Sequence, residues 1–366
     1  MSGGPVNSLI LPGTGNVTGN DAGNVDEELK LKIRETIEKT FAKPDEKQFA
    51  DRAVAAMVAL GVGDAAGDLG RDDATRQKYG VLINLPPEGK STDDTEFTVL
   101  SARSILECPG EFNAEFVAET WRKLVLSDGG ARDRGGMPLY GALSNLARGI
   151  NPPLSGIDNV FNVDDGAAMR SVPFGIVGYG DTKKAAALAA VDASVSHDND
   201  GIWAAQAIAA STTIALMGGS VDEVIEAGRA CIPDDSWLGR NMDKTFAMLN
   251  ETDDPDDAYE ALHTLLWTPK HSSSPEAIPQ VYGLYKLSGG DFRKGFILSA
   301  NFGRDADTIC ALVLALCAAG QGLSVIPERW IEQVRHPAGV CLRFAAKEDM
   351  VDLGLKLAAQ AIKQAG

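Results

Sequence analysis

The chain has 366 residues, a formal net charge of −17 at pH 7, and 44% hydrophobic residues. This length is enough for one large domain or two ordinary ones, and the composition permits a substantial buried core. The acidic excess argues against nucleic acids and anionic membrane surfaces as partners, and an anionic substrate would need a local positive feature.

The cysteines and the apolar segments indicate a reducing, cytoplasmic setting. No CxxC or other paired spacing occurs among the five cysteines, which are Cys108, Cys231, Cys310, Cys317 and Cys341. The first residues lack a basic segment followed by an apolar run, so we expect no signal peptide. The segment Gly201–Gly219 comes closest to a membrane span, but its Gln206 and its Ser and Thr residues favour a core helix.

The N-terminal part divides into a leader and an extension. Residues 1–25 are rich in Gly, Asn and Pro and are predicted to be a flexible leader. Residues 26–47 are predicted to be a helical extension. Its amphipathic helix over 26–42 has the candidate apolar set Leu29, Leu31, Ile33, Ile37 and Phe41.

Residues 48–366 are predicted to form one all-α domain without internal repeats. A helix begins at Gln48 and is expected to end at Gly61-Val62-Gly63, where the small-residue segment Gly61–Gly70 starts. Residues 71–90 are predicted to be a surface loop. Val340–Phe344 is the best candidate for a short strand. Apolar periodicity predicts further helices over 95–107, 113–126, 139–146, 181–194, 203–216, 221–229, 243–249, 258–267, 276–287, 292–300, 309–319, 327–334 and 348–364.

Two carboxylates lie at the mouth of an almost wholly apolar helix. Asp305 and Asp307 precede Thr308 and the run that ends at Gly320. An Asp at a helix start commonly caps the free N–H groups. Capping alone does not explain two carboxylates beside a buried helix, because burying a carboxylate is costly unless it is paired or bound to a metal.

A second acidic helix mouth lies at Thr92, Asp93 and Asp94, ahead of the apolar run that begins at Phe97. Adjacent residues inside a helix point in different directions, so both carboxylates can reach one site only at a helix mouth or in a turn. The two mouths together could supply four carboxylates and two threonine hydroxyls. Two divalent cations would balance four charges, and all-oxygen ligands select Mg²⁺, Mn²⁺ or Ca²⁺. The alternative is two capped helices with solvated acids.

Other segments carry weaker signals. Asp64-x-x-Gly67 is typical of tight helix packing. The turn at Asp164-Asp165 leads into very small residues whose exposed N–H groups could hold an anion, although a capped helix explains the same pattern. His197 lies at a helix junction beside Asp198. The remaining histidines form no metal-binding spacing and are His263, His271 and His336.

Several of these segments, taken in order, resemble the ADP-ribosylglycohydrolase family over about residues 48–335. They are Gly63–Gly67, Thr92–Thr95, Asp165–Arg170, Ser196-His197, Asn301–Thr308, and the closing Gly320, Gly322, Pro327 and Trp330. The resemblance implies a single compact, multi-helix orthogonal bundle with a binuclear Mg²⁺ or Mn²⁺ centre. Members of this family remove ADP-ribose from arginine or serine side chains or cleave related compounds.

The resemblance also implies roles for individual residues. Asp93 and Asp94 are the candidate catalytic residues. The candidate metal ligands are Thr92, Asp93, Asp94, Asp305, Asp307 and Thr308. The candidate substrate-binding residues are Asp64, the diphosphate loop Gly166, Ala167, Ala168, Met169 and Arg170, and His197 near the distal ribose.

Two positions depart from the family pattern. The family often has Asn before the Gly-Ala-Ala-Met-Arg run, whereas this chain has Asp164-Asp165, and two carboxylates would repel a diphosphate unless they point away. Some serine-specific members carry a Glu shortly after the Gly-Asp-x-x-Gly motif. The corresponding place here is near Arg71-Asp72, which argues against cleavage at serine.

The leading hypothesis is metal-dependent hydrolysis of a bond at C1 of a ribose, with Asp93 or Asp94 as general base or as stabiliser of oxocarbenium character. The expected partner is an ADP-ribosylated protein or a small ADP-ribosyl or N-ribosyl compound, and a monomer is favoured. The alternatives are an N-ribosyl hydrolase of a nucleoside-like metabolite and a non-catalytic binding or structural member, as an eye-lens crystallin of the family suggests. A terpene-synthase-like lyase is discounted, because Phe97 stands where that motif has Asp.

Overall fold

The computed structural model describes residues 27–366, so the predicted leader over 1–25 lies outside the described residues. These residues form eighteen α-helices, and no β-strand occurs among them, which confirms the all-α prediction. The helices are α1 (Glu28–Thr40), α2 (Pro44–Gly70), α3 (Asp73–Tyr79), α4 (Asp93–Glu107), α5 (Ala114–Leu124), α6 (Met137–Ala147), α7 (Leu154–Ile157), α8 (Val172–Gly178), α9 (Thr182–Ala193), α10 (Asp200–Leu216), α11 (Val221–Arg229), α12 (Trp237–Glu251), α13 (Pro255–Leu265), α14 (Ser274–Ser288), α15 (Phe292–Ala300), α16 (Ala306–Gln321), α17 (Glu328–Val334) and α18 (Met350–Ala365).

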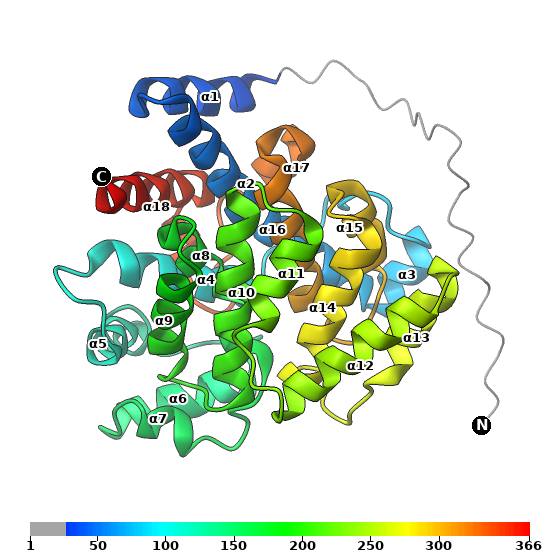
Figure 1. Cartoon of the computed structure of the whole chain (residues 1–366). Helices are drawn as coiled ribbons and strands as arrows, with labels where there is room; N and C mark the ends of the chain where they lie inside the picture. Colours follow the sequence, from blue (N-terminus) through cyan, green and yellow to red (C-terminus); the bar gives the residue numbers. More distant parts are fainter. Residues whose placement is uncertain (1–26) are drawn as a thin grey trace.

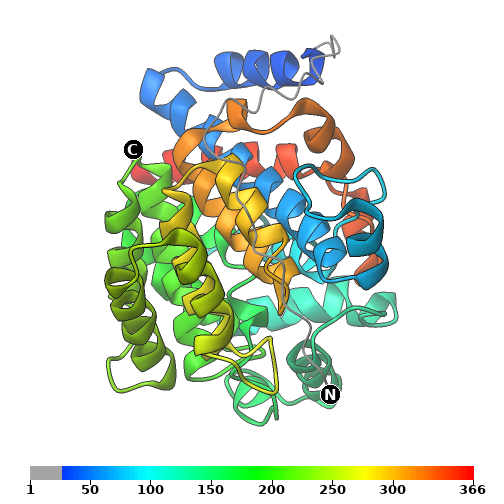
Figure 2. The same cartoon turned by 90° about the vertical axis from the view of Figure 1, so that its right-hand side faces the viewer.

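Helices α2 and α16 pack along each other at the centre of the molecule. Figures 1 and 2 show α18, α10, α14 and α15 arranged around this pair. Almost every residue from Ala306 to Ala319 is buried, as expected for an apolar helix enclosed by other helices. The central pair therefore fixes where the N-terminus of α16 lies.

The close approach of α2 to α16 depends on glycine. A Cβ added at Gly63 would lie 2.4 Å from the carbonyl oxygen of Cys310, and one added at Gly67 would lie 1.9 Å from that of Ala306. The prediction that the first long helix ends at Gly61-Val62-Gly63 is wrong, because α2 continues to Gly70. The small residues are a packing face within the helix rather than its end.

Helix α2 is long and apolar enough to cross a membrane by length and composition, and 89% of its most apolar window is buried inside the protein. That burial is the property of a central core helix. The segment Gly201–Gly219, which the sequence favoured as a core helix, contains the buried helix α10.

The N-terminal extension packs on the outside of the main bundle, where α1 contacts α2 and α17. The backbone N–H of Leu29 donates a hydrogen bond of 2.6 Å to Glu328. Ile33, Ile37 and Phe41 are buried as predicted. Leu31, which the apolar set included, is 55% exposed, because it lies on the outer face of α1.

Two local predictions are wrong. The loop over 71–90 contains α3, whose N-terminus is capped by Asp72 through the N–H of Thr75 at 2.8 Å. Val340–Phe344 is not a strand. The N–H groups of residues 340 and 341 donate to the buried Glu96 carboxylate at 2.8 and 2.9 Å, so a side chain satisfies the backbone instead of a ladder.

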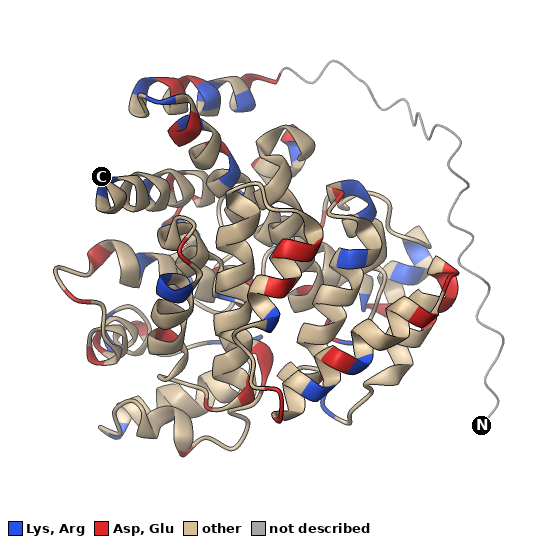
Figure 3. Cartoon of the chain, in the orientation of Figure 1, with Lys and Arg blue, Asp and Glu red and all other residues tan. Residues whose placement is uncertain are grey.

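Acidic and basic residues are interspersed over elements throughout the described part of the molecule (Figure 3). The net negative charge is therefore spread widely over the molecule. A buried group of acidic residues lies where α4 and α16 begin.

Candidate metal centre

Asp64 on α2 organises the N-terminus of α4. Its carboxylate accepts hydrogen bonds from the N–H and the hydroxyl of Thr92, both at 2.6 Å, and from the N–H and the hydroxyl of Thr95 at 3.2 and 2.5 Å. Asp64 thus caps α4 in place of the N-cap residue Thr92, whose own side chain makes no capping hydrogen bond. Asp64 was a candidate for substrate binding, and the structure places it behind the helix mouth as a support.

Asp93 and Asp94 are the first two residues of α4, and both are buried. Asp93 Oδ2 accepts a hydrogen bond of 3.2 Å from the N–H of Gly136, whereas Asp94 Oδ1 is buried without a hydrogen-bond partner. Burial and the charge of Asp64 raise the pKa of Asp93 to about 7. Burial and the charge of Asp307 raise the pKa of Asp94 well above its usual range, so the two helix mouths face each other.

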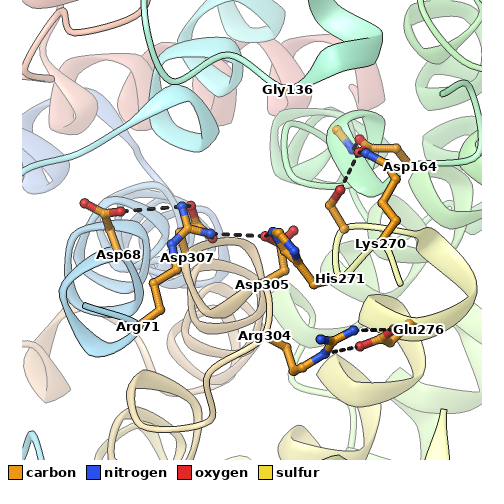
Figure 4. Close-up of polar contacts among 12 residues, drawn as sticks. Asp68, Arg71, Gly136, Asp164, Lys270, His271, Glu276, Arg304, Asp305 and Asp307 are labelled. Atoms are coloured by element: carbon orange, nitrogen blue, oxygen red, sulfur yellow. Dashed lines mark hydrogen bonds and ion pairs between the residues drawn. The ribbon is translucent and has the colours of Figure 1, made fainter. Parts of the chain in front are cut away.

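Asp305 is the N-cap residue of α16 and Asp307 is the second residue of that helix. A basic side chain lies against both (Figure 4): Arg71 Nη1 is 3.2 Å from Asp305 Oδ1 and 2.7 Å from Asp307 Oδ1. On the other side, His271 Nε2 is 3.2 Å from Asp305 Oδ1. Although burial opposes it, the contact with His271 and the charge of Arg71 lower the pKa of Asp305.

Arg71, Arg134 and His271 are site residues that sequence reasoning missed. Arg134 pairs with Asp68 and lies 3.8 Å from Asp307 Oδ2. None of the three belongs to a motif, and each approaches the acidic helix mouths from a different segment. The only signal was that Arg71 directly follows the small-residue face of α2.

The loop that leads to α16 is held by a buried ion pair. Arg304, at φ 56°, places its Nε 2.6 Å from Glu276 Oε1 and its Nη2 3.0 Å from Oε2. Glu276 lies in the first turn of α14 and is fully buried. This bidentate contact fixes the direction in which Asp305 enters the site.

Asp164 and Asp165 point to different surroundings. Asp164 Oδ2 accepts hydrogen bonds of 2.7 Å from Lys270 and from Ser272, and its Oδ1 accepts one of 2.8 Å from the N–H of Gly166. Against the effect of burial, His197 and Lys270 lower the pKa of Asp164. The repulsion between Asp164 and a diphosphate that the sequence suggested is thus offset by Lys270.

The loop from Gly166 to Met169 is supported from behind. Thr98 on α4 donates to the carbonyl of Met169 at 3.2 Å, and Arg170 donates to the carbonyl of Gly166 at 2.6 Å. Arg170 is fully buried and also pairs with Asp192 at 2.6 Å, so the structure places it as a support of the loop rather than on its open side. Ala167 and Ala168 are fully buried.

His197 is buried beside this loop. Its Nδ1 lies 2.7 Å from the hydroxyl of Ser196, and its Nε2 lies 3.6 Å from Asp164 Oδ1. Burial lowers the pKa of His197, which favours the neutral imidazole. An added Cβ at Gly166 would lie in ordinary van der Waals contact with this ring, at 3.4 Å, and in a tighter contact of 3.0 Å with Asp164 Oδ1.

The donor set suits a hard divalent cation, although its side chains do not yet converge. Among the described residues no three His, Cys, Asp or Glu side chains are close enough to hold one ion together, and Arg71 occupies the space beside Asp305 and Asp307. The donors are carboxylate and hydroxyl oxygens. The Thr92 hydroxyl donates its proton to Asp64, which leaves its lone pairs free, and Asp94 Oδ1 lacks any partner. Thr308 is buried in the first turn of α16. These residues fit Mg²⁺ or Mn²⁺.

Arg71 is expected to compete with a divalent cation for Asp305 and Asp307. Changing Arg71→Met should tighten Mg²⁺ binding several-fold and lower the melting temperature of the metal-free protein, because the guanidinium neutralises carboxylates that repel one another. Calorimetric titration and thermal melts measure both effects. Arg34→Met is the control, because it removes the same charge from the exposed face of α1. Weaker Mg²⁺ binding in Arg71→Met would show that Arg71 supports the metal-bound form.

Comparison with known proteins agrees with this architecture. A family model described as ADP-ribosylglycohydrolase matches residues 45–365. An uncharacterized protein from Archaeoglobus fulgidus is 32% identical over 294 residues, which cover 76% of this chain and 90% of the relative. The uncharacterized protein YegU from Escherichia coli K12 is 23% identical over 305 residues, which cover 75% of this chain and 89% of the relative.

A solved structure titled "ADP-ribosylglycohydrolase-related protein complex" superposes with a TM-score of 0.61 at 23% identity, covering 86% of this chain and 99% of that chain. At this identity the superposition shows a shared fold. Together with the family match over residues 45–365, it confirms the predicted multi-helix bundle. The chain belongs to the ADP-ribosylglycohydrolase family.

Proposed function

We propose that this protein is a metal-dependent hydrolase of a ribosyl C1 bond and that it removes ADP-ribose from a modified protein side chain or from a related small compound. Family membership supports glycosyl hydrolase activity, and the family is metal-dependent in general. The observation that carries the proposal is the burial of two acidic helix mouths against each other, with Asp94 Oδ1 left unpartnered. A buried cluster of this kind requires cations.

The proposed ligands of two Mg²⁺ or Mn²⁺ ions are the six residues Thr92, Asp93, Asp94, Asp305, Asp307 and Thr308. When bound there, divalent ions would orient a ribose diol and lower the pKa of a bound water molecule. Asp64 fixes the direction of Thr92 and of the first turn of α4. Asp93 or Asp94 accepts the proton of the attacking water or stabilises positive charge at C1.

Basic side chains near the acidic helix mouths support an anionic substrate. Arg71 lies on one side, and Lys270 and His271 lie on the other, with Asp305 and Asp307 between them (Figure 4). Arg134 lies 3.8 Å from Asp307 Oδ2. When divalent ions balance the carboxylates, these side chains become available to a diphosphate. A neutral nucleoside is an alternative because Asp164 and Asp165 would repel a diphosphate. The pairing of Lys270 with Asp164 neutralises one of these two charges.

Rate measurements on three substrates test the proposal. ADP-ribosyl-arginine, ADP-ribosyl-serine and a nucleoside are incubated with the protein in Mg²⁺, in Mn²⁺ and in EDTA. We expect hydrolysis of an ADP-ribosyl compound only in the presence of metal, and less at serine than at arginine. Hydrolysis of the nucleoside alone would identify the small-substrate alternative. Lack of turnover on all three, together with lack of metal binding, would favour a non-catalytic member.

A further inference from the structure

Asp165 is a buried carboxylate that is not one of the six proposed metal ligands. Helix capping does not explain its burial either. It begins the 3₁₀ helix η2 (Asp165–Ala167) and is 2% exposed. Its backbone is fixed, because its N–H donates to the carbonyl of Ser272 at 2.8 Å. The carbonyl of the preceding Asp164 accepts a hydrogen bond of 2.9 Å from Ser274. The direction of the Asp165 side chain therefore follows from a well-anchored turn.

The Asp165 side chain is directed at the acidic helix mouths. Burial and the charges of Asp305, Asp164 and Asp94 raise the pKa of Asp165 well above its usual range, so these carboxylates lie near it. Its Oδ2 is buried without a hydrogen-bond partner. The adjacent Asp164 differs, because all its contacts are with Lys270, Ser272, Gly166 and His197.

Asp165 also lacks a counterion. Among the described residues no Lys, Arg or His nitrogen lies within 4.0 Å of its carboxylate. On the facing loop, Lys270 is paired with Asp164 and His271 with Asp305. The groups that face it are Asp305 from the start of α16 and Asp94 from the start of α4, and both are negative. A buried, unpaired carboxylate among carboxylates is stable only if a cation joins them.

We propose that Asp165 is a fifth carboxylate ligand of the metal centre, in addition to Asp93, Asp94, Asp305 and Asp307. The inference rests on the proposed metal-dependent function. It adds a fifth negative charge to the proposed ligand set, and two divalent cations neutralise four of the five. It also explains why one residue of the Asp164-Asp165 pair is neutralised by Lys270 and the other is left without a protein partner.

The test is the binding of Mn²⁺ to Asp165→Asn, measured by calorimetry and by electron paramagnetic resonance of the bound ions. Asn keeps the size of the side chain and removes its charge. We expect the affinity for one of the two ions to fall at least about tenfold, because ligand charge sets the affinity of such sites. The melting temperature of the metal-free variant should rise, because repulsion with Asp305 and Asp94 is relieved, whereas that of the Mn²⁺-loaded variant should fall.

The matched control is Asp158→Asn, which removes the same charge from an exposed position a few residues earlier and should bind Mn²⁺ like the wild type. Wild-type affinity and stoichiometry in Asp165→Asn would overturn the inference and leave the proposed function standing. A wild-type protein that binds no Mn²⁺ would overturn both. If Asp165→Asn does not fold, Asp165→Ser replaces it, with the same loss of affinity expected and the same result overturning the proposal.

Discussion

Replacing Asp94 by Asn, or Asp307 by Asn, is expected to abolish turnover while the protein stays folded. Each substitution removes one charge from the proposed ligand set, and we expect a loss of at least about a thousandfold in rate, because the ions supply several kcal/mol of transition-state stabilisation. The fold should survive, because both carboxylates are buried among like charges that raise their pKa values. Removing such a charge relieves repulsion in the metal-free protein.

The measurement is the initial rate on an ADP-ribosyl substrate in Mg²⁺, with far-UV circular dichroism to check the fold. Asp73→Asn, on the exposed face of α3, is the control and should keep the wild-type rate. A wild-type rate in Asp94→Asn or in Asp307→Asn would contradict the proposed metal-dependent mechanism. An unfolded variant would show instead that the carboxylate is needed for structure.

Gly67→Ala is expected to cost about 3 kcal/mol or more in the free energy of unfolding, the upper end of the usual range for overpacking. The new Cβ would lie 1.9 Å from the carbonyl oxygen of Ala306 and 2.6 Å from the N–H nitrogen of Asp307. Both are backbone atoms at the start of α16, which cannot turn away as a side chain can. The same displacement should weaken metal binding, because it moves Asp307.

Urea denaturation measures the free energy of unfolding of Gly67→Ala. Gly110→Ala is the matched control, because an added Cβ there meets nothing within 4 Å. We expect that control to lie within about 0.5 kcal/mol of the wild type. Equal stability of both variants would mean that α2 and α16 separate more easily than their packing indicates.

Local sequence signals were enough to predict the bounds of several helices. The predicted range of α15, Phe292–Ala300, agrees with the structure, because Asp291 caps it through the N–H of Lys294 at 2.7 Å. The range of α11 agrees for the same reason, since Ser220 and Glu223 form a capping box at its start. Caps and apolar periodicity are properties of neighbouring residues, so sequence alone contains them.

The parts of the site that sequence did not predict depend on contacts between distant segments. Arg71 contacts residues 234 and 236 positions away, and Lys270 neutralises Asp164 across 106 positions. The support that Asp64 gives to Thr92 likewise requires α2 and α4 to meet. The identities of the acidic residues were predictable from two helix-mouth motifs. Their counterions and supporting residues were not, because no local pattern marks them.

The most direct measurement is calorimetric titration of ADP-ribose into the wild-type protein, first with about millimolar Mg²⁺, the usual regime for such sites, and then with EDTA. Our account predicts binding in Mg²⁺ that is lost in EDTA, because ions held by the acidic residues at the starts of α4 and α16 would contribute to binding the ribose. Binding of equal strength in EDTA, or lack of binding in both conditions, would contradict it.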